Sequence, residues 1–217
     1  MRGNSSALIL DFGGVVTRTM FETHELTEKA LGLDQGSLTW RGPFEPDHDT
    51  LWQSMQRNEI SERDYWLERT KQVSTMTGKN WTKMSDFIKA ARSAAPEEII
   101  RPEFYTAINR ATQSGVRLAI LSNELDLFYG SDFREKLSFL SEFEVIHDAT
   151  YTNILKPDPA AYLGCLTKLD LNADQCVFVD DQARNVEGAI KVGLQTVHFD
   201  VQNPKNSYRQ ALQLLGL

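Results

Sequence analysis

Cysteine is scarce in this 217-residue sequence, which contains only Cys165 and Cys176. The two form neither a CxxC pair nor any spacing typical of a zinc site. We therefore expect two reduced thiols in or near the core, as in proteins of a reducing compartment.

Long apolar runs are also missing. No run approaches the ~20 residues that a helix needs to cross a bilayer. The N-terminal segment MRGNSSALILDFGG has an apolar stretch too short for the core of a signal peptide, and it leads directly into Asp11. These features predict a cytoplasmic protein with no membrane partner.

An excess of basic residues is absent as well, because 23 Lys and Arg face 30 Asp and Glu, for a net charge of −7. A general nucleic-acid-binding protein needs a basic face, so we expect no nucleic-acid partner. A small anionic substrate remains compatible with this charge, since helix N-termini, one lysine and a metal ion can supply local positive potential. The length allows one sizeable core with a smaller inserted domain.

Continuous apolar runs that end at glycine or polar residues predict strands buried on both faces. Three runs are strong and two are weaker: 7–11, 116–121 and 176–179, then 143–147 and 195–199. Helical patterns alternate with them at 102–115, 158–170, 183–193 and 204–217. This alternation predicts right-handed βαβ units, and hence an α/β fold with a doubly wound, Rossmann-like parallel sheet.

The stretch 18–95 contains no strong strand and reads as helical. Its helical patterns cover 20–33, 49–60, 61–78 and 81–95. Ser61 and Asp64 have the spacing of a capping pair at the start of the third of these segments. We predict a core domain of residues 1–16 and 96–217, with an all-helical cap domain of residues 17–95 inserted after the first strand. Such a cap would close over the strand ends, exclude water and select the substrate.

Polar side chains follow several of the predicted strands. They are Asp11, Ser122 with Asn123, Lys156 in the loop NILKPDP, and Asp180 with Asp181. Ligands of open parallel sheets bind outside the carboxyl ends of the strands, so these side chains are candidates for one site.

The residue types suit phosphoryl chemistry. A carboxylate such as Asp11 can attack phosphorus or carbon, and the glycines after it let the backbone turn sharply near a ligand. Ser122 and Asn123 can donate hydrogen bonds to phosphoryl oxygens, while Lys156 can neutralise their charge. The acidic pair at 180–181 offers the hard oxygen ligands that Mg²⁺ prefers.

Taken alone, each feature has an ordinary structural explanation. Asp11 could cap a helix, and Ser122 with Asn123 could form a turn. Lys156 could be a solvated loop residue, and the acidic pair could stabilise a helix start. The four features together, each at or beside a predicted strand end, favour a site.

The segments ILDFGGV, LAILSN, KPDP and FVDDQARNVEGA, in this order, resemble the four motifs of the haloacid dehalogenase (HAD) superfamily, and the helical insertion resembles its C1-type cap. The resemblance implies that Asp11 is a nucleophile that forms an aspartyl-phosphate. It further implies that Ser122, Asn123 and Lys156 bind the phosphoryl group, with Lys156 also pairing with Asp11. Mg²⁺ would be held by Asp11, Asp181, the backbone carbonyl of Gly13, and Asp180 as a ligand or an anchor.

The sequence departs from this pattern at Gly13, where phosphatases of the superfamily carry a second Asp that serves as acid and base. Val15 likewise replaces a typical Thr or Ser. Three hypotheses remain: a Mg²⁺-dependent phosphatase with weak or substrate-assisted proton transfer, a metal-independent 2-haloacid dehalogenase, and a HAD-fold protein that binds a ligand with little or no turnover. The retained acidic pair favours the phosphatase, since holding a cation explains it. His24 and His48, in the predicted cap, are candidates for a replacement acid, although packing or surface roles are the simpler explanation. The resemblance implies a small phosphorylated metabolite as substrate, and a homodimer is compatible with the sequence.

Overall fold

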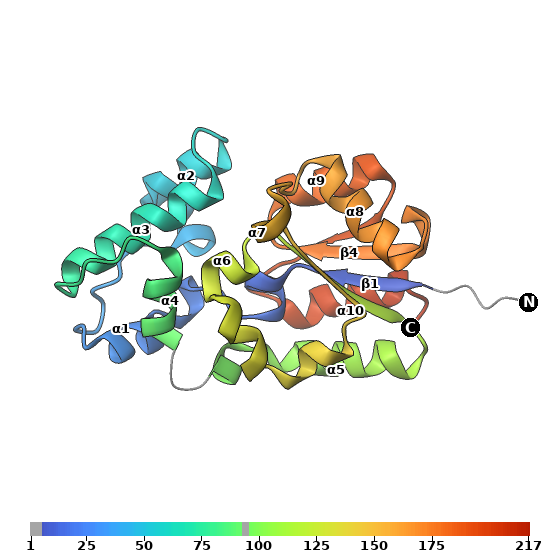
Figure 1. Ribbon diagram of the computed structural model, residues 1–217, viewed down its shortest axis with the longest axis horizontal. Helices are drawn as coiled ribbons and strands as arrows, with labels where there is room; N and C mark the ends of the chain where they lie inside the picture. The colour runs from blue at the N-terminus through green and yellow to red at the C-terminus, as the bar shows by residue number, and fades with distance from the viewer. Residues whose placement is uncertain (1–5, 93–95) are drawn as a thin grey trace, which may run out of the picture. The chain divides into compact units, whose positions relative to one another are not determined.

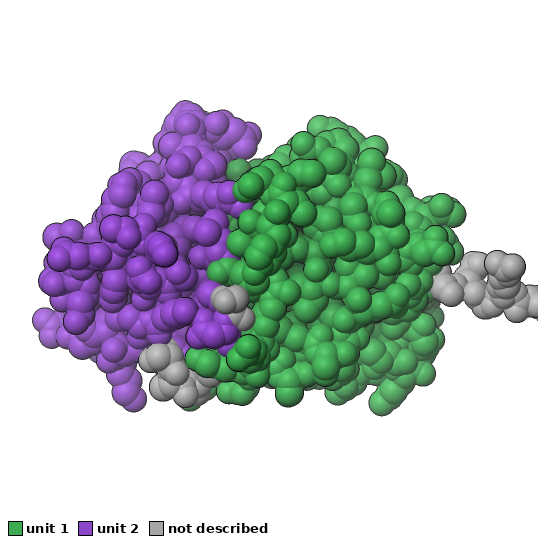
Figure 2. Space-filling view, in the orientation of Figure 1, with its two compact units in different colours: residues 1–18, 97–126, 134–217 green, residues 19–96, 127–133 purple. Residues whose placement is uncertain are grey.

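The computed structural model describes residues 6–92 and 96–217, which divide into two compact units (Figure 2). The α/β unit contains Met1–Arg18, Glu97–Asp126 and Arg134–Leu217, and the helical unit contains Thr19–Pro96 and Leu127–Phe133. Residues 93–95, the end of the last predicted cap helix, lie outside the described residues, as do residues 1–5. That the units are separate domains with the predicted boundaries stays a prediction.

The α/β unit is built on a five-stranded sheet in the order β3-β2-β1-β4-β5, with every neighbouring pair parallel (Figure 1). The strands are β1 (Ala7–Leu10), β2 (Arg117–Ser122), β3 (Val145–Asp148), β4 (Cys176–Asp180) and β5 (Gln195–His198). All five predicted strands are present, with ends that differ by one or two residues, and the Rossmann-like α/β class is confirmed.

Both faces of the central strands are buried. Along β1, Ala7 and Ile9 belong to a cluster on one face, while the alternating Leu8 and Leu10 are equally buried on the other. The same alternation runs along β4, where Phe178 belongs to that first cluster. This two-sided burial explains why these strands appear in the sequence as unbroken apolar runs.

Helices cover both faces of the sheet (Figure 1). Helices α8 (Pro159–Leu169) and α9 (Ala183–Val192) pack on one face, and α5 (Pro102–Gln113) and α10 (Pro204–Leu214) pack on the other. Two shorter helices are α6 (Leu125–Tyr129) and α7 (Ala149–Thr152). The four long helices match the predicted ones, although each ends one to three residues earlier than its sequence pattern.

The helical unit contains α1 (His24–Leu31), α2 (Thr50–Gln56), α3 (Glu62–Met76) and α4 (Met84–Arg92). The capping pair at the start of α3 is present: the Asp64 N–H donates to Ser61 Oγ at 3.1 Å, and the Ser61 N–H donates to Asp64 Oδ2 at 3.0 Å. Helix α2 is shorter than its predicted range of 49–60, since the chain turns at Asn58, whose φ is 59°.

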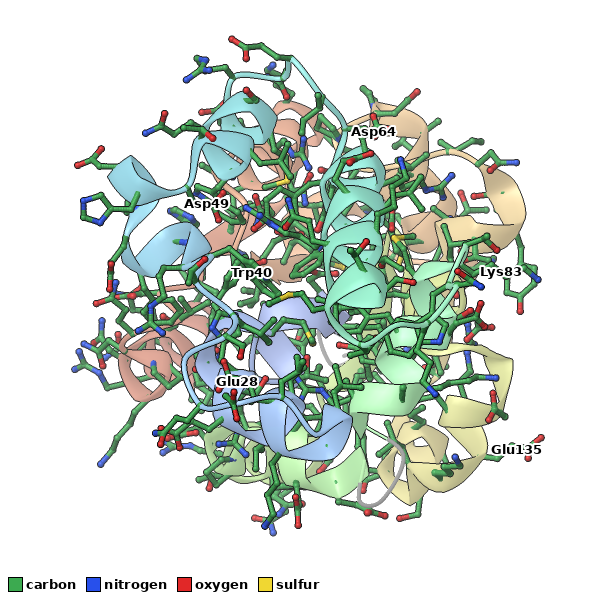
Figure 3. All side chains as sticks on the ribbon, turned by 90° about the vertical axis from the view of Figure 1, so that its left-hand side faces the viewer. Glu28, Trp40, Asp49, Asp64, Lys83 and Glu135 are labelled. Carbon is green, nitrogen blue, oxygen red and sulfur yellow. The ribbon has the colours of Figure 1, made fainter. Side chains whose placement is uncertain are left out.

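The core of the helical unit combines aromatic rings with a buried ion pair. Figure 3 labels Trp40 and Asp49 in this unit. The Asp49 side chain, fully buried, accepts hydrogen bonds from the Trp52 N–H and the Tyr65 hydroxyl and pairs with the Arg69 guanidinium. Trp66 packs against Phe128 with 5.2 Å between ring centroids. Segment 127–133 therefore contributes to this core although no sequence pattern pointed to it.

Both cysteines are free and buried, as predicted. Burial raises the pKa of Cys165 to about 12 and that of Cys176 to about 11, so both thiols stay protonated at neutral pH. Within residues 6–92 and 96–217, no helix has the length and apolar character that crossing a membrane requires.

Candidate active site

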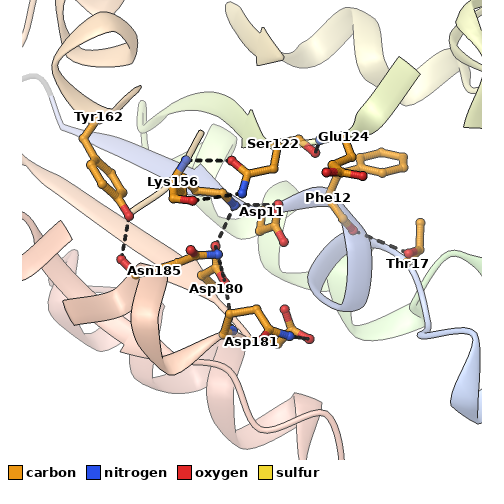
Figure 4. A network of polar contacts seen from close by, with 12 residues as sticks. Asp11, Phe12, Thr17, Ser122, Glu124, Lys156, Tyr162, Asp180, Asp181 and Asn185 are labelled. Carbon is orange, nitrogen blue, oxygen red and sulfur yellow. Dashed lines mark hydrogen bonds and ion pairs between the residues drawn. The ribbon is translucent and has the colours of Figure 1, made fainter. Parts of the chain in front are cut away.

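The candidate site lies where three parallel strands of the α/β unit end (Figure 4). Asp11 directly follows β1, Ser122 is the last residue of β2, and Asp180 is the last residue of β4. Because β1 lies between β2 and β4, their carboxyl ends come together at one edge of the sheet. The Asp11 N–H donates to Val179 O at 2.9 Å, which holds the aspartate backbone against the end of β4.

Lys156 connects Asp11, from the first motif (ILDFGGV), with Asp180, from the fourth motif (FVDDQARNVEGA). Its Nζ lies 2.8 Å from Asp11 Oδ1 and 2.6 Å from Asp180 Oδ2, and its side chain is 1% exposed. Burial alone would lower the pKa of Lys156, but the charges of Asp11 and Asp180 raise it above its ordinary value. The side chain is therefore a permanent cation beside the Asp11 carboxylate.

Asn123 holds the backbone of Lys156 in place. Its Nδ2 donates to Lys156 O at 3.1 Å, and its Oδ1 accepts from the Lys156 N–H at 2.7 Å. This pairing ties the end of β2 to the loop that carries the lysine, 33 residues later. Direct contact of Asn123 with a phosphoryl group stays a prediction, as does that of Ser122, which is buried and whose Oγ accepts a long 3.4 Å bond from the Glu124 N–H.

Asp180 is fixed by several donors besides Lys156. Its Oδ1 accepts from the Gln182 N–H at 2.8 Å, and Asn185 Nδ2 lies 3.1 Å from both of its carboxylate oxygens. Asn185 is itself held by the Tyr162 hydroxyl, which donates to Asn185 O at 2.7 Å. Sequence reasoning missed Asn185, although it lies one helical turn beyond the acidic pair, on the first turn of α9, where its side chain can fold back toward Asp180.

Three carboxylates converge at this edge. Asp11, Asp180 and Asp181 each offer an oxygen, and these three atoms lie within 4.8 Å of one another. Like charges at that distance repel, so a cation bound among them would stabilise their approach. An all-oxygen donor set suits a hard divalent cation. The residues present therefore fit a metal site.

The turn after Asp11 makes room for this cluster. Residues Phe12–Val16 form one wide turn that the Thr17 N–H closes onto Phe12 O at 3.0 Å. Within it, Gly14 has φ 78°, and a Cβ there would lie 2.6 Å from Asp181 Oδ2. Gly13 has φ −70° and ψ 129°, and a Cβ there would meet nothing within 4 Å. Gly14 is thus required by the close approach of Asp181, whereas Gly13 is not required by sterics.

Two buried side chains from distant parts of the α/β unit hold this turn, and sequence reasoning missed both. Arg101 Nε donates to Gly14 O at 3.0 Å, and the Tyr208 hydroxyl donates to Val15 O at 2.9 Å. Arg101 also donates its backbone N–H to Val16 O at 3.0 Å. No local sequence pattern indicates these residues, because each donates a hydrogen bond to a turn about 90 to 190 positions away in the chain.

The two histidines considered as replacement acids lie in the helical unit. His24 is buried against Trp40, with 4.3 Å between ring centroids, and burial lowers the pKa of His24 to about 4. It is therefore a neutral core residue at physiological pH. His48 is 79% exposed in its side chain and lies 3.4 Å from Glu45.

A family model gives an independent view of the same residues. The model of the haloacid dehalogenase-like hydrolases matches residues 6–193, a range that includes all four motifs and the helical insertion. The chain belongs to the haloacid dehalogenase-like hydrolase family. The resemblance inferred from the sequence is thereby confirmed at the level of the superfamily, while the C1 type of the cap stays a prediction.

Individual curated proteins resemble parts of the chain at low sequence identity. Acyl-CoA dehydrogenase family member 10 of Mus musculus is 25% identical over 167 residues, which are 76% of this chain but 15% of the mouse protein. Phosphatase MT3486 of Mycobacterium tuberculosis is 25% identical over 118 residues, which are 50% of this chain and 54% of that phosphatase. The chain thus spans about half or less of the length of these relatives.

A solved structure described as a dehalogenase is similar in fold. It has a TM-score of 0.62 and 21% sequence identity, and the match covers 97% of this chain and 92% of that one. At this identity, the likeness supports the HAD-like fold and not a particular reaction.

The HAD-like site therefore brings together four of the residues expected from the sequence, namely Asp11, Lys156, Asp180 and Asp181, with Ser122 and Asn123 at the adjacent strand end. Gly13 lies in the turn beside Asp11. Its carbonyl as a metal ligand, and the chemical role of each residue, stay predictions.

Proposed function

We propose that this HAD-like hydrolase is a Mg²⁺-dependent phosphatase that transfers the phosphoryl group of a small phosphorylated metabolite to Asp11 and then to water. The observation that carries the proposal is the placement of Lys156 Nζ between Asp11 and Asp180, beside a third carboxylate that completes a cation-binding set. The phosphatase name of one relative supports the same reaction class.

The metal would be held by Asp11, Asp181 and the carbonyl of Gly13, with Asp180 as a ligand or as the anchor of the cluster. When bound, Mg²⁺ would neutralise negative charge that otherwise opposes the approach of a phosphate to three carboxylates. Room for Asp181 depends on the missing side chain of Gly14.

The side chains around the proposed metal site have separate roles in phosphoryl transfer. Lys156 pairs with the Asp11 carboxylate and offers positive charge to the phosphoryl oxygens. Ser122 and Asn123 lie at the end of β2, next to the nucleophile, and the serine hydroxyl can donate to a phosphoryl oxygen. Asp11 attacks phosphorus to form the aspartyl-phosphate, whose hydrolysis returns the free carboxylate.

The alternative reaction is metal-independent dehalogenation of a 2-haloacid, in which Asp11 attacks carbon and halide leaves without a proton. The empty position at Gly13 is compatible with it, since such a step needs no second acid. The three-carboxylate cluster counts against it, because dehalogenation gives no reason to gather that much negative charge. A third alternative is a HAD-fold protein that binds a phosphorylated ligand with little turnover.

A direct test measures phosphate release from a panel of small phosphomonoesters, with Mg²⁺ and with a chelator, by wild type and Asp11→Asn. The proposal predicts release that falls to background in the chelator and in Asp11→Asn. Asp174→Asn should keep it, because this exposed carboxylate precedes β4, at the opposite end of the strand from Asp180. Halide release from 2-chloropropionate without metal would instead establish the dehalogenase. Saturable phosphate-ester binding without release would establish a binding protein.

A further inference from the structure

The charged side chains whose contacts at Asp11 are described already have partners or a proposed role. Lys156 is committed to Asp11 and Asp180, at 2.8 and 2.6 Å, and has 1% of its side chain exposed, so it acts as a charge partner. Asp180 and Asp181 belong to the proposed cation site. Glu124, which follows Ser122 and Asn123, is a further carboxyl drawn at the site (Figure 4), and it is buried. The test below therefore includes it.

The position beside the nucleophile that could carry an acid is open. A Cβ on Gly13 would meet no atom within 4 Å, and its φ of −70° with ψ of 129° is accessible to any L-residue. The neighbouring Gly14 differs, since a side chain there would collide with Asp181. The backbone thus has room for a carboxyl at residue 13, and the chain does not supply one.

From this arrangement we propose, building on the phosphatase function above, that the substrate is a phosphate ester or mixed anhydride whose leaving oxygen departs as a stable anion. Suitable oxygens are those of an anomeric hydroxyl, an enol, a phenol or a carboxylic acid. Esters of ordinary alcohols are poor substrates because their alkoxides need a proton as they leave.

In the first step of the proposed reaction, the leaving oxygen receives no proton from the protein. An Asp11 oxygen forms a bond to phosphorus, and the bond from phosphorus to the leaving oxygen breaks with its electron pair on that oxygen. The anion takes its proton from water afterwards. In the second step, water attacks phosphorus, the Asp11–phosphorus bond breaks, and one proton passes to solvent, so that inorganic phosphate and free Asp11 result.

General acid–base help typically contributes 10²–10⁴-fold in rate, by the order-of-magnitude range for positioned side chains. Its absence therefore has little effect on esters with acidic leaving groups and a large effect on alkyl esters. This sensitivity to leaving-group acidity is the measurable signature of the proposal.

The test measures kcat/KM for a set of phenyl phosphates with ring substituents from nitro to methoxy, together with methyl phosphate, in saturating Mg²⁺. Wild type, Gly13→Asp, Gly13→Asn and Glu124→Gln are compared. The expected wild-type result is a steep fall as the leaving group becomes less acidic, on the order of 10²-fold across the phenols. Gly13→Asp should raise the rate on methyl phosphate by on the order of 10²-fold and flatten the fall. Gly13→Asn, of equal size without an acid, should do neither.

The outcomes separate this proposal from the one it rests on. If kcat/KM of wild type depends only weakly on leaving-group acidity, or if this dependence becomes steep in Glu124→Gln, the chain already provides an acid. Either result would overturn the proposal, while the phosphatase function would stand. If Gly13→Asp is inactive, the proposal can still be judged. The dependence of kcat/KM on leaving-group acidity is then compared between wild type and Glu124→Gln. Absence of any Asp11-dependent phosphate release, even from nitrophenyl phosphate, would overturn both.

Discussion

Gly14 and Asp181 approach each other so closely that a Cβ atom on the glycine would lie 2.6 Å from Oδ2 of the aspartate. The contact joins the turn after β1 to the residue after β4, which are about 170 positions apart in the chain. Gly14 also has φ 78°, a conformation that L-residues with side chains rarely adopt. Its two requirements, for backbone freedom and for empty space, can be separated experimentally.

The variant Gly14→Ala should displace the Asp181 carboxylate and weaken Mg²⁺ binding and phosphate release together. The matched control is Gly115→Ala, because Gly115 has φ 77° but a Cβ there would meet nothing within 4 Å. Both variants should lose about 1 kcal/mol of unfolding free energy through the left-handed backbone. Only Gly14→Ala should lose Mg²⁺ affinity in calorimetry, by about tenfold or more if one ligand is misplaced. Equal Mg²⁺ affinity in the two variants would contradict the assigned role of this contact.

A second prediction concerns the buried charges of Lys156 and Asp180. Lys156→Met should lower the free energy of unfolding by about 3–5 kcal/mol, because it leaves two carboxylates without their cation, and the Asp180 side chain is fully buried. Adding Asp180→Asn should recover part of this loss, since the second change removes the uncompensated buried charge. Urea unfolding at pH 7 measures both effects.

The control for that experiment is a surface ion pair. Lys89 Nζ lies 2.8 Å from Asp132 Oδ1, with about half of each side chain exposed, so Lys89→Met should cost less than about 1 kcal/mol. Equal losses in the two lysine variants would show that Lys156 is not buried with its partners as described.

A third prediction is a loss of stability in mild acid that depends on His24. Burial is the main cause that lowers its pKa from 6.5 to about 4, and the charge of Arg41 adds to it, while Glu28 opposes it. A folded-state pKa below the unfolded value means that the fold favours the neutral ring. The stabilisation is present above pH 6.5 and is lost as the pH falls toward 4, up to about 3 kcal/mol for a shift of this size.

The variant His24→Phe should reduce this acid sensitivity while keeping an aromatic edge against Trp40. Neither ring nitrogen of His24 has a hydrogen-bond partner among the described residues, so the replacement leaves no partner unsatisfied. Urea midpoints compared at pH 7 and pH 4.5 measure the effect, with His48→Gln as the exposed control. Identical pH dependence in wild type and His24→Phe would assign the acid sensitivity to other groups.

Much of the fold follows from patterns that are local in the sequence. The strands β1, β2 and β4 are buried on both faces, so their apolar runs are continuous, and the polar residue that ends each run marks the edge of the sheet. This is why Asp11, Ser122 and Asp180 could be placed at one site before any coordinates. The placement needed only the rule that parallel strands share a carboxyl edge.

The supporting residues could not be predicted in the same way. Arg101 and Tyr208 act on the turn at 12–16, and their sequence neighbours give no hint of this, because the contact arises only when the helices pack on the sheet. Asn123 illustrates a subtler limit. Its proximity to the site was predictable, whereas its pairing with the Lys156 backbone depends on where a loop 33 residues later happens to lie.

The last prediction follows from the missing carboxyl at Gly13 and concerns the second half of the reaction. Water that attacks the aspartyl-phosphate would normally lose its proton to a nearby base, and such help typically contributes 10²–10⁴-fold. If none is supplied, hydrolysis of the phosphorylated enzyme becomes slow, so nitrophenyl phosphate should give a burst of one equivalent of nitrophenol followed by a slower steady rate. Intact-mass measurement during turnover should detect one added phosphoryl group in wild type and none in Asp11→Asn. Gly13→Asp should shrink the burst by accelerating the slow phase. A linear time course without phosphorylated enzyme would mean that a base elsewhere in the chain serves the hydrolysis step.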